Sequence, residues 1–329
     1  MGVNIKDVAQ KAEVSVTTVS RVLNNRGSIS EKTKEKVHSA MRELNYYPNQ
    51  VAVNLLKKRT QLVGLIVPDV SHTFYATEIK YIEHALYEAG YKLLLCSSEE
   101  SNTRESEHLN MLQCNKVDGI IIASHTLNLE AYSKVTLPVV ALDRYLGKNI
   151  PTVSSDHNQG GRFAADELIR CNCKNVVQIV GYGKVPTPSN ERHICFEQTL
   201  KEGGVTCRTF ELPLNAFRFS EYIDFVQKIF VEDNKIDGVF AVDNVICAVC
   251  KVADKLNIDI PEQLKLVGYD GTEISLMPSK TLTTIEQDIE LIAETTVNTL
   301  ISMINKTTVF EPETHIKIPV KLVRRETSV

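Results

Sequence analysis

The sequence predicts an α/β protein: a three-helix head containing a helix-turn-helix, followed by a two-lobed body of doubly wound parallel sheets. Residues 5–23 carry two short apolar-periodic segments separated by a polar turn, which is typical of a helix-turn-helix. From Leu62 onward, apolar β-rich runs alternate with amphipathic stretches, which indicates parallel strands covered by helices on both faces. Two such series follow one another along the 329 residues, and they indicate two lobes.

Three helices are predicted in the head from apolar residues spaced three and four positions apart. Their stripes are Ile5, Val8, Ala9 and Ala12 in the first, Val19, Val22 and Leu23 in the second, and Val37, Ala40, Met41 and Leu44 in the third. Side-chain oxygens that can cap the three helix starts stand at Asn4, Ser15 and Ser30. The outer face of the second helix carries donors that suit a DNA major groove, namely Thr17, Thr18, Ser20 and Arg21.

Charge is divided along the chain, although the whole protein is slightly acidic with a net charge of −4. Residues 1–60 hold 11 Lys and Arg against five Asp and Glu, a net of +6, which leaves −10 for residues 61–329. A basic head on an acidic body is the electrostatic footprint of a DNA-binding module joined to a second unit.

A hinge and linker are predicted over residues 47–60. Pro48 ends the preceding helix, and Asn49 can cap a new one of about two turns, which is too short to persist in water and should become ordered on a template. Leu55 and Leu56 precede three consecutive cations, and one of these leucines can act as a wedge in a minor groove. An ordinary linker with an apolar patch is the alternative.

The body is predicted to contain strands at residues 62–70, 91–98, 119–124, 138–143, 175–182, 208–214, 238–243 and 265–271. Helices are predicted between them, at 75–89, 103–114, 160–170, 190–202, 218–232, 244–257 and 288–305, before a final strand within IKIPVKLVRR. Doubly wound sheets bind ligands beyond the carboxyl ends of their strands. Polar residues recur at these ends, among them Asp69, Ser97, Ser124, Asp143, Asp243 and Asp270.

Several classes of protein and site are disfavoured by the sequence. The eight cysteines include a Cys247-x-x-Cys250 pair and a Cys171-x-Cys173 pair, but neither has the paired spacing of a zinc site, so neither a metal nor a cofactor is expected. An enzyme with a dinucleotide site is a weak alternative, because Gly181-Tyr182-Gly183 lacks the third glycine. An exported binding protein would need a signal peptide and no basic head. We therefore expect a cytoplasmic protein that does not bind membranes.

The order of parts resembles the lactose-repressor family of bacterial transcription regulators. The resemblance rests on DVAQKAEVSVTTVSRVLN in the head, on YYPNQVAVNLL in the hinge and on the two-lobed body, which implies a periplasmic-binding-protein-like fold. Within the family, the stretches at 142–161, 267–275, 282–288 and 318–323 most resemble sucrose operon repressors of Gram-positive bacteria, with ribose operon repressors a near second.

The resemblance implies roles in DNA binding. Val16, Thr17 and Arg21 match the positions that read bases, because Arg can pair with guanine while Val and the Thr methyl suit thymine. Ser15, Thr18, Ser20 and Asn24 match backbone contacts, and Ala52 and Leu55 match minor-groove positions in the hinge. Glu13 replaces the glycine usual in the turn, so a positive φ there would cost on the order of 1 kcal/mol unless the turn relaxes.

The resemblance also implies an effector site between the lobes. The positions that match it are Phe74, Asp143, Arg192, Phe219, Asp243, Asp270 and Gln287. Carboxylates and Arg hydrogen-bond sugar hydroxyls, and aromatic rings cover the apolar faces of a sugar.

Together these features predict a repressor of a sugar-utilisation operon that binds a palindromic operator as a homodimer. A small sugar effector, sucrose or a related fructose-containing sugar, should release it. A ribose operon repressor, or a catabolite-control regulator with a phosphoprotein corepressor, is the alternative. The expected domains are the head at 1–46, the hinge at 47–60 and the body at 61–329, with an N-lobe at about 61–157 and 289–329 and a C-lobe at about 158–288.

Overall fold

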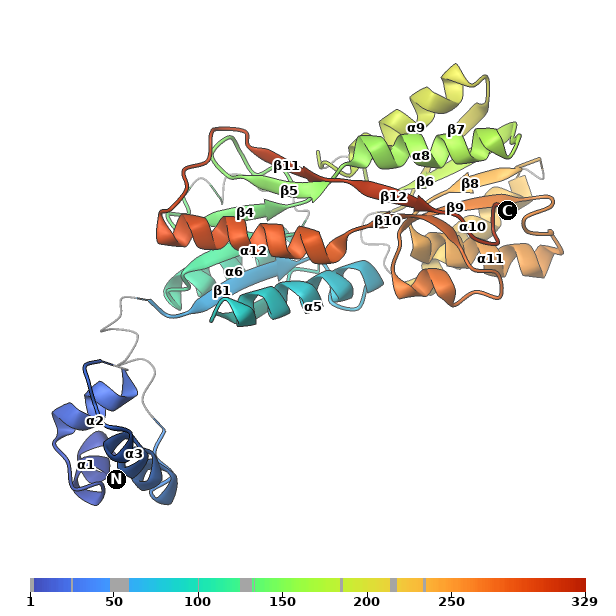
Figure 1. Cartoon of the computed structure of the whole chain (residues 1–329). Helices are drawn as coiled ribbons and strands as arrows, with labels where there is room; N and C mark the ends of the chain where they lie inside the picture. Colours follow the sequence, from blue (N-terminus) through green and yellow to red (C-terminus); the bar gives the residue numbers. More distant parts are fainter. Residues whose placement is uncertain are drawn as a thin grey trace. The chain divides into compact units, whose positions relative to one another are not determined.

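The computed structural model describes residues 3–24, 26–47, 59–99, 101–124, 132, 134–183, 186–213, 218–232 and 235–329. The chain divides into two compact units, residues 1–61 and 62–329, and each is described by itself (Figure 1). The predicted α/β fold with a helical head is confirmed.

The head unit contains α1 (Ile5–Lys11), α2 (Val16–Leu23) and α3 (Glu31–Glu43) around a small apolar core. Val8, Val19 and Val37, one from each helix, are fully buried in this core. Each helix begins at a predicted cap. Asn4 forms a capping box with Asp7, while the hydroxyls of Ser15 and Ser30 accept from the backbone N–H three residues on.

The turn between α1 and α2 keeps the left-handed conformation. Glu13 has φ of 56°, where a side chain with a Cβ is strained by on the order of 1 kcal/mol relative to glycine. The turn has therefore not relaxed around the glutamate. Val14, directly after it, packs against the core of the head.

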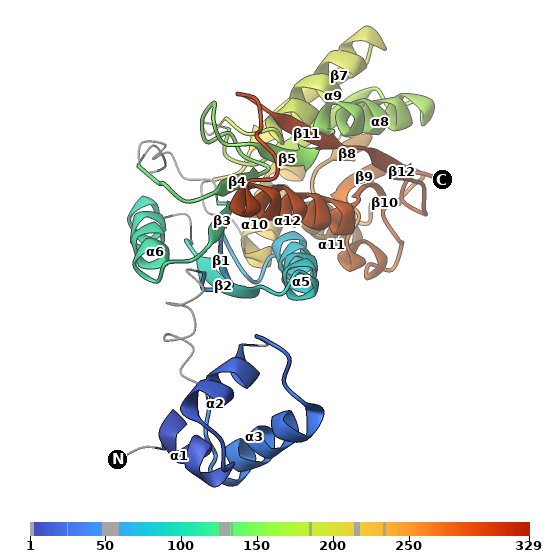
Figure 2. The same ribbon diagram turned by 60° about the vertical axis from the view of Figure 1, so that its left-hand side comes forward.

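The body contains two six-stranded sheets. The first has the strand order β11-β5-β4-β3-β1-β2 and is wholly parallel. Its strands are β1 (Leu62–Val67), β2 (Lys92–Ser97), β3 (Gly119–Ile122), β4 (Val139–Leu142), β5 (Thr152–Ser155) and β11 (His315–Ile318). One face is covered by α5 (Thr73–Glu88) and α12 (Ile289–Asn305) and the other by α6 (Asn102–Cys114), which makes a three-layer lobe (Figure 2).

The second sheet has the order β12-β10-β9-β8-β6-β7, and only its β10–β12 pair is antiparallel. Its strands are β6 (Asn175–Val180), β7 (Thr206–Glu211), β8 (Gly238–Phe240), β9 (Lys265–Asp270), β10 (Thr283–Gln287) and β12 (Val320–Val323). One face is covered by α8 (His157–Arg170) and α9 (Asn190–Glu202), the other by α10 (Phe219–Glu232) and α11 (Asp243–Leu256). A short 3-10 helix, η1 (Glu273–Leu276), follows β9.

Two strands, β5 and β10, lie outside the ranges predicted for strands. Their sequences, TVSS and TTIEQ, are polar, so they lack the Val, Ile and Leu runs that mark a buried parallel strand. The sheet nevertheless buries them, because internal bonds satisfy their hydroxyls. Thr152 donates to the Arg144 carbonyl over 3.0 Å, and the Ser155 hydroxyl donates to Gln287 over 2.6 Å.

The end of the chain differs from the predicted lobe assignment. Residues 289–329 were all expected in the N-lobe, but the final apolar run divides at Pro319. β11 pairs with β5 in the first sheet, whereas β12 pairs with β10 in the second. Proline cannot donate a ladder hydrogen bond, so it suits the point where a strand leaves one sheet for another. Residues 320–329 therefore belong to the C-lobe.

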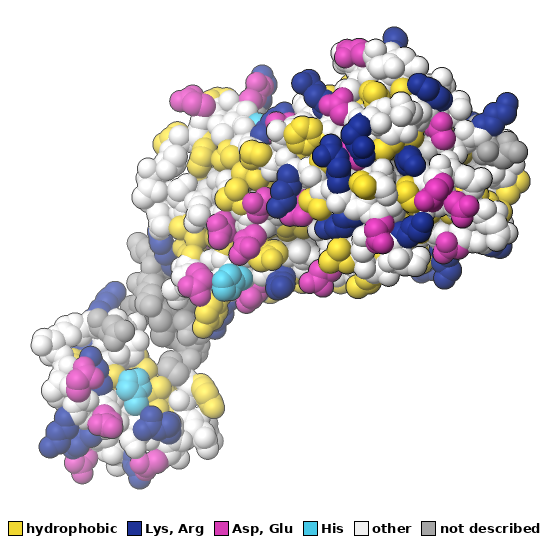
Figure 3. Space-filling view, turned by 45° about the vertical axis from the view of Figure 1, so that its right-hand side comes forward, with side chains coloured by type: hydrophobic (Ala, Val, Ile, Leu, Met, Phe, Trp, Pro, Cys, Tyr) yellow, Lys and Arg dark blue, Asp and Glu magenta, His cyan; other side chains and the backbone are white. Residues whose placement is uncertain are grey.

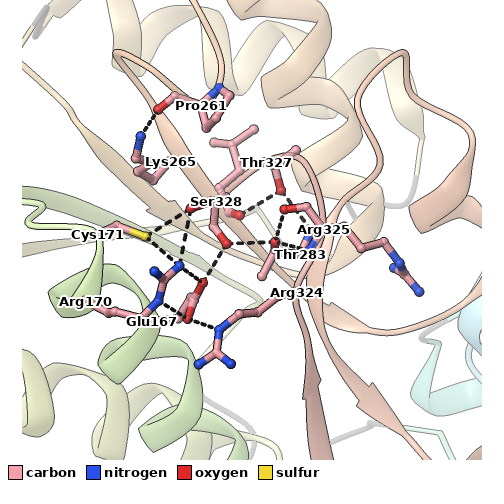
Figure 4. Close-up of polar contacts among 11 residues, drawn as sticks. Glu167, Arg170, Cys171, Pro261, Lys265, Thr283, Arg324, Arg325, Thr327 and Ser328 are labelled. Carbon is pink, nitrogen blue, oxygen red and sulfur yellow. Dashed lines mark hydrogen bonds and ion pairs between the residues drawn. The ribbon is translucent and has the colours of Figure 1, made fainter.

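The last residues are anchored in the C-lobe by a buried carboxylate (Figure 4). Glu167 on α8 accepts hydrogen bonds from Arg170, from Arg324 and, over 2.6 Å, from the Ser328 hydroxyl. Thr327 continues the anchor by donating to the Leu266 carbonyl over 3.0 Å. Burial alone would raise the pKa of Glu167, but these hydrogen bonds outweigh it and lower the pKa to about 2.

Charge on the surface of the body is mixed. On the face that Figure 3 shows, acidic and basic side chains are interspersed over the body, so the negative net charge is not gathered into one patch there.

We expect Glu167 to make the stability of the body depend on acid pH. Its pKa is lower in the folded chain than the ordinary 4.5, so its contribution is complete above about pH 4.5 and is lost as pH falls through about 2. The full contribution is on the order of 3 kcal/mol. The variant Glu167→Gln should lose this contribution to the free energy of unfolding. Urea denaturation at pH 6, 4 and 3 should show the stability gap between the wild type and Glu167→Gln narrowing toward acid; a constant gap would contradict this account.

Candidate DNA-binding face and effector site

The exposed face of α2 carries the three predicted base-reading residues. Val16 is 41% exposed, and Thr17 and Arg21 are exposed as well, while Val19 and Val22 on the opposite face are buried. The helix therefore presents an apolar group, a hydroxyl and a guanidinium to the solvent, and none of the three is buried in the core.

Of the four residues predicted to contact the DNA backbone, Ser15, Thr18 and Asn24 lie toward the ends of α2, and Ser20 lies in its middle. The Ser15 and Thr18 hydroxyls are 2.8 Å apart, and Ser15 also accepts from the Thr18 backbone N–H. At the other end the Asn24 side chain donates to the Ser20 carbonyl over 2.7 Å. These residues hold the helix ends in place, which fixes how the helix presents its outer face. The hinge candidates Ala52 and Leu55 lie outside the described residues.

In the body, the two sheets meet at a polar cluster that joins the lobes. His157, the first residue of α8, has its Nε2 atom 2.8 Å from Asp143 Oδ1 and its Nδ1 atom 2.7 Å from the Tyr269 hydroxyl. Asp143 follows β4 of the N-lobe and has φ of 50°, whereas Tyr269 lies in β9 of the C-lobe. One imidazole thus connects strand ends from both sheets.

A second connection passes through Gln287 at the end of β10. Its carbonyl accepts from the Ser155 hydroxyl of the N-lobe over 2.6 Å, and its amide donates to Asp270 Oδ1 over 2.8 Å. Asp270 ends β9 and is buried. Burial raises the pKa of Asp270 to about 7, the charge of Asp143 adds to this, and the Arg192 guanidinium opposes it.

Arg192 completes the cluster from α9. Its guanidinium carbon lies 4.3 Å from the centre of the Tyr269 ring, a cation–π arrangement. The close packing of α8 against this region requires glycine. A Cβ at Gly160 would lie 2.7 Å from the Tyr269 ring, and one at Gly161 would overlap the Arg192 carbonyl. Asp143, Arg192, Asp270 and Gln287, predicted separately, are therefore brought together.

Of the other three predicted effector residues, Asp243 lies near the cluster: burial raises its pKa, and the charge of Asp270 adds to this. Asp243 is fully buried at the start of α11, where it accepts from the Thr284 hydroxyl over 2.7 Å and from the Gly271 N–H over 2.9 Å. Its oxygens thus order the segment after β9. Phe74 is half-buried in the first turn of α5, and Phe219 is 42% exposed at the start of α10.

His157 and Tyr269 are missing from the predicted site. Tyr269 lies in the buried strand β9, so the sequence pattern does not distinguish it from a core residue. His157 is the first residue of α8, and no motif of fixed spacing in the sequence marks it as a site residue. The adjacent Gly160-Gly161 pair is the one local signal, since consecutive glycines in a helix indicate a close approach of other groups.

Among the residues that the structure describes, no group of three or more His, Cys, Asp or Glu side chains is arranged to hold a metal ion. No helix in the described ranges is long and apolar enough to cross a membrane.

Comparison with known families assigns both units. The model of the bacterial regulatory proteins of the lacI family matches residues 4–49. A second family model, for the periplasmic binding proteins and sugar binding domain of the LacI family, matches residues 60–326. The chain belongs to the lacI family of bacterial regulatory proteins, as the sequence predicted.

Individual relatives are similar over nearly the whole chain. The sucrose operon repressor of Streptococcus mutans is 40% identical over 306 residues, covering 93% of this chain and 94% of the relative. The ribose operon repressor of Halalkalibacterium halodurans is 35% identical, covering 98% and 96%. These relatives are repressors, which agrees with the prediction of a regulator and not an enzyme.

Solved structures share the fold. The lac repressor dimer bound to operator and an anti-inducer superposes with a TM-score of 0.88 at 24% identity, over all of both chains. A periplasmic binding protein/LacI transcriptional regulator from Alkaliphilus metalliredigens, complexed with D-xylulofuranose, has a TM-score of 0.75 at 29% identity. It covers 82% of this chain and 99% of its own.

Proposed function

We propose that this chain represses a sugar-utilisation operon, binds its operator as a homodimer in the cytoplasm, and is released by a fructose-containing sugar such as sucrose. The observation that carries the proposal is the polar cluster of Asp143, His157, Arg192, Asp270 and Gln287, which joins both lobes of a lacI-family body.

The head supports the DNA-binding part of the proposal. A helix-turn-helix places the exposed face of its second helix in the major groove. Arg21 can donate both arms of its guanidinium to one guanine, while Val16 and the Thr17 methyl suit thymine methyl groups. The net charge of +6 over residues 1–60 attracts the phosphate backbone regardless of sequence.

The cluster supports a sugar as effector. Carboxylates accept from sugar hydroxyls, and Arg192 and Gln287 donate to them. The sucrose operon repressor relative is the more similar of the two operon repressors described above, at 40% identity. D-xylulofuranose in the Alkaliphilus protein is a ketose in a five-membered ring, the form that the fructosyl unit of sucrose also has. Ribose is the second candidate, favoured by the 35% identical ribose operon repressor.

The coupling between sugar and operator follows from the position of His157. A sugar that bonds Asp143 competes with the 2.8 Å contact between Asp143 and His157, and so alters the connection between the lobes. A ligand shifts an equilibrium only through its different affinity for two states. Here the two states differ in how the N-lobes, and hence the paired heads, are arranged.

The homodimer has a candidate surface on the N-lobe. β2 is an edge strand of the first sheet, and Leu95 within it is 42% exposed, while Tyr87 near the end of α5 is 70% exposed. We expect sedimentation velocity to give a dimer at micromolar concentration and Leu95→Glu to shift it toward monomer. A monomeric wild type that still binds a palindromic operator tightly would contradict the proposal.

Arg21→Ala should lose discrimination at one guanine of each half-site, by about 1–3 kcal/mol per contact. Lys57→Ala is the contrasting variant: it should weaken binding to every sequence and reduce the salt dependence. Fluorescence anisotropy with operator and random duplexes at several salt concentrations separates the two effects. Equal losses on both duplexes for Arg21→Ala would remove it from base reading.

Asp143→Ala should still bind operator, because the link from Ser155 through Gln287 to Asp270 still joins the lobes, but sugar should no longer release it, because the variant lacks the carboxylate that the sugar bonds. The exposed Asp166→Ala is the matched control and should respond like the wild type. If sugar weakens operator binding 100-fold, the coupling is about 2.7 kcal/mol, and operator must weaken sugar binding equally. Identical sugar affinities of the wild type with and without operator would rule the mechanism out.

A further inference from the structure

Glu78 is a buried carboxyl group that the preceding sections leave unexplained. It lies in the second turn of α5, one turn after Phe74, and is 1% exposed. Its Oε2 atom has no hydrogen-bond partner among the described residues. Burying a polar atom without a partner is unfavourable, so a polar group in this state calls for an explanation.

The position of Glu78 on α5 is one where packing favours an apolar residue. Residues four apart share a face of a helix, and Glu78 continues the stripe of Ile82 and Leu86, both fully buried in the N-lobe core. The stripe is thus apolar over two turns and acidic at the turn nearest the start of the helix. That start faces the C-lobe, because the Thr73 hydroxyl donates to Asn244 of α11 over 2.8 Å.

The charges of two acids of the polar cluster act on Glu78. Burial is the main cause that raises the pKa of Glu78 well above its usual value, and the charges of Asp143 and Asp270 add to it. One of these neighbours belongs to each lobe. The unpartnered oxygen is therefore buried near the end of α5 that contacts the C-lobe, where the acids of the polar cluster act on it.

We propose that Glu78 is an effector-binding residue whose carboxyl hydrogen-bonds a sugar hydroxyl. A protonated carboxyl has one O–H donor and a free acceptor oxygen, and a sugar hydroxyl has the complementary pair. Because the bound molecule is taken to be a sugar, this assignment rests on the proposed function. In the free protein the unsatisfied carboxyl lowers stability, and the ligand supplies the missing partner.

The variant Glu78→Ile distinguishes a purely structural role of Glu78 from a role in effector binding. Isoleucine continues the apolar stripe of Ile82 and Leu86, so the thermal midpoint of the free protein should rise or stay unchanged. Sugar affinity should fall about tenfold, the worth of one buried hydrogen bond. Glu78→Gln keeps a donor and an acceptor and should stay within a few-fold of the wild type.

The test is isothermal titration calorimetry on the full chain with sucrose, fructose, ribose and fructose 6-phosphate, together with thermal unfolding without sugar. The control variant is Glu83→Gln, an exposed carboxyl on the same helix, which should match the wild type in both measurements. If Glu78→Ile fails to fold, Glu78→Asp decides, because shortening the side chain by one methylene withdraws the carboxyl from the ligand and should also weaken binding.

The outcomes separate this assignment from the proposed function. Wild-type affinity for the bound sugar in Glu78→Ile, or in Glu78→Asp where the former does not fold, overturns the role of Glu78 and leaves a sugar-responsive repressor standing. If the wild type binds none of the four sugars, both the proposed effector class and this assignment are overturned. Operator binding then still tests the DNA-binding role of the head.

Discussion

The two lobes of the body are joined by polar contacts, and one imidazole contacts both lobes. His157 lies between Asp143 of the N-lobe and Tyr269 of the C-lobe, and the parallel link from Ser155 through Gln287 to Asp270 reinforces it. These contacts are polar and few, in contrast with the large apolar cores inside each lobe. Polar contacts can be exchanged for contacts to a hydroxylated ligand at little net cost, whereas apolar cores cannot. The lobes are thus stable units joined by an exchangeable link.

Buried acids define the electrostatics of this link. Glu78, Asp243 and Asp270 all have raised pKa values because burial disfavours their charged forms. They differ in how their oxygens are satisfied. Asp243 is held by groups of its own lobe, Asp270 by Gln287, and Glu78 has an oxygen without a partner in the described structure. The contrast with Glu167 is instructive: two arginines and a serine hydroxyl surround that carboxylate, which stays ionised and anchors the chain end.

The head follows different physics. Its small core needs only a few apolar residues from each helix, and its helix ends are capped by local side chains. The caps and the strained turn at Glu13 depend on residues close in sequence, while Val8, Val19 and Val37 bring the three helices together in one core. The outer face of α2 does not contribute to this core, so Val16 and Arg21 remain exposed.

The sequence by itself determined the head, the caps, the alternation of strands and helices in the body and the family, because these depend on local periodicity and on motifs of fixed spacing. It also indicated Asp143, Arg192, Asp270 and Gln287 as site candidates. Only the tertiary structure decided that these four meet, that His157 and Tyr269 join them, and that Asp243 is held by its own lobe. It alone placed the polar strands β5 and β10, and it moved β12 into the second sheet. These features arise from contacts between separate elements of the chain, and some of the partners are more than 100 positions apart, such as Ser155 with Gln287 and His157 with Tyr269. Local patterns carry no information on such pairs.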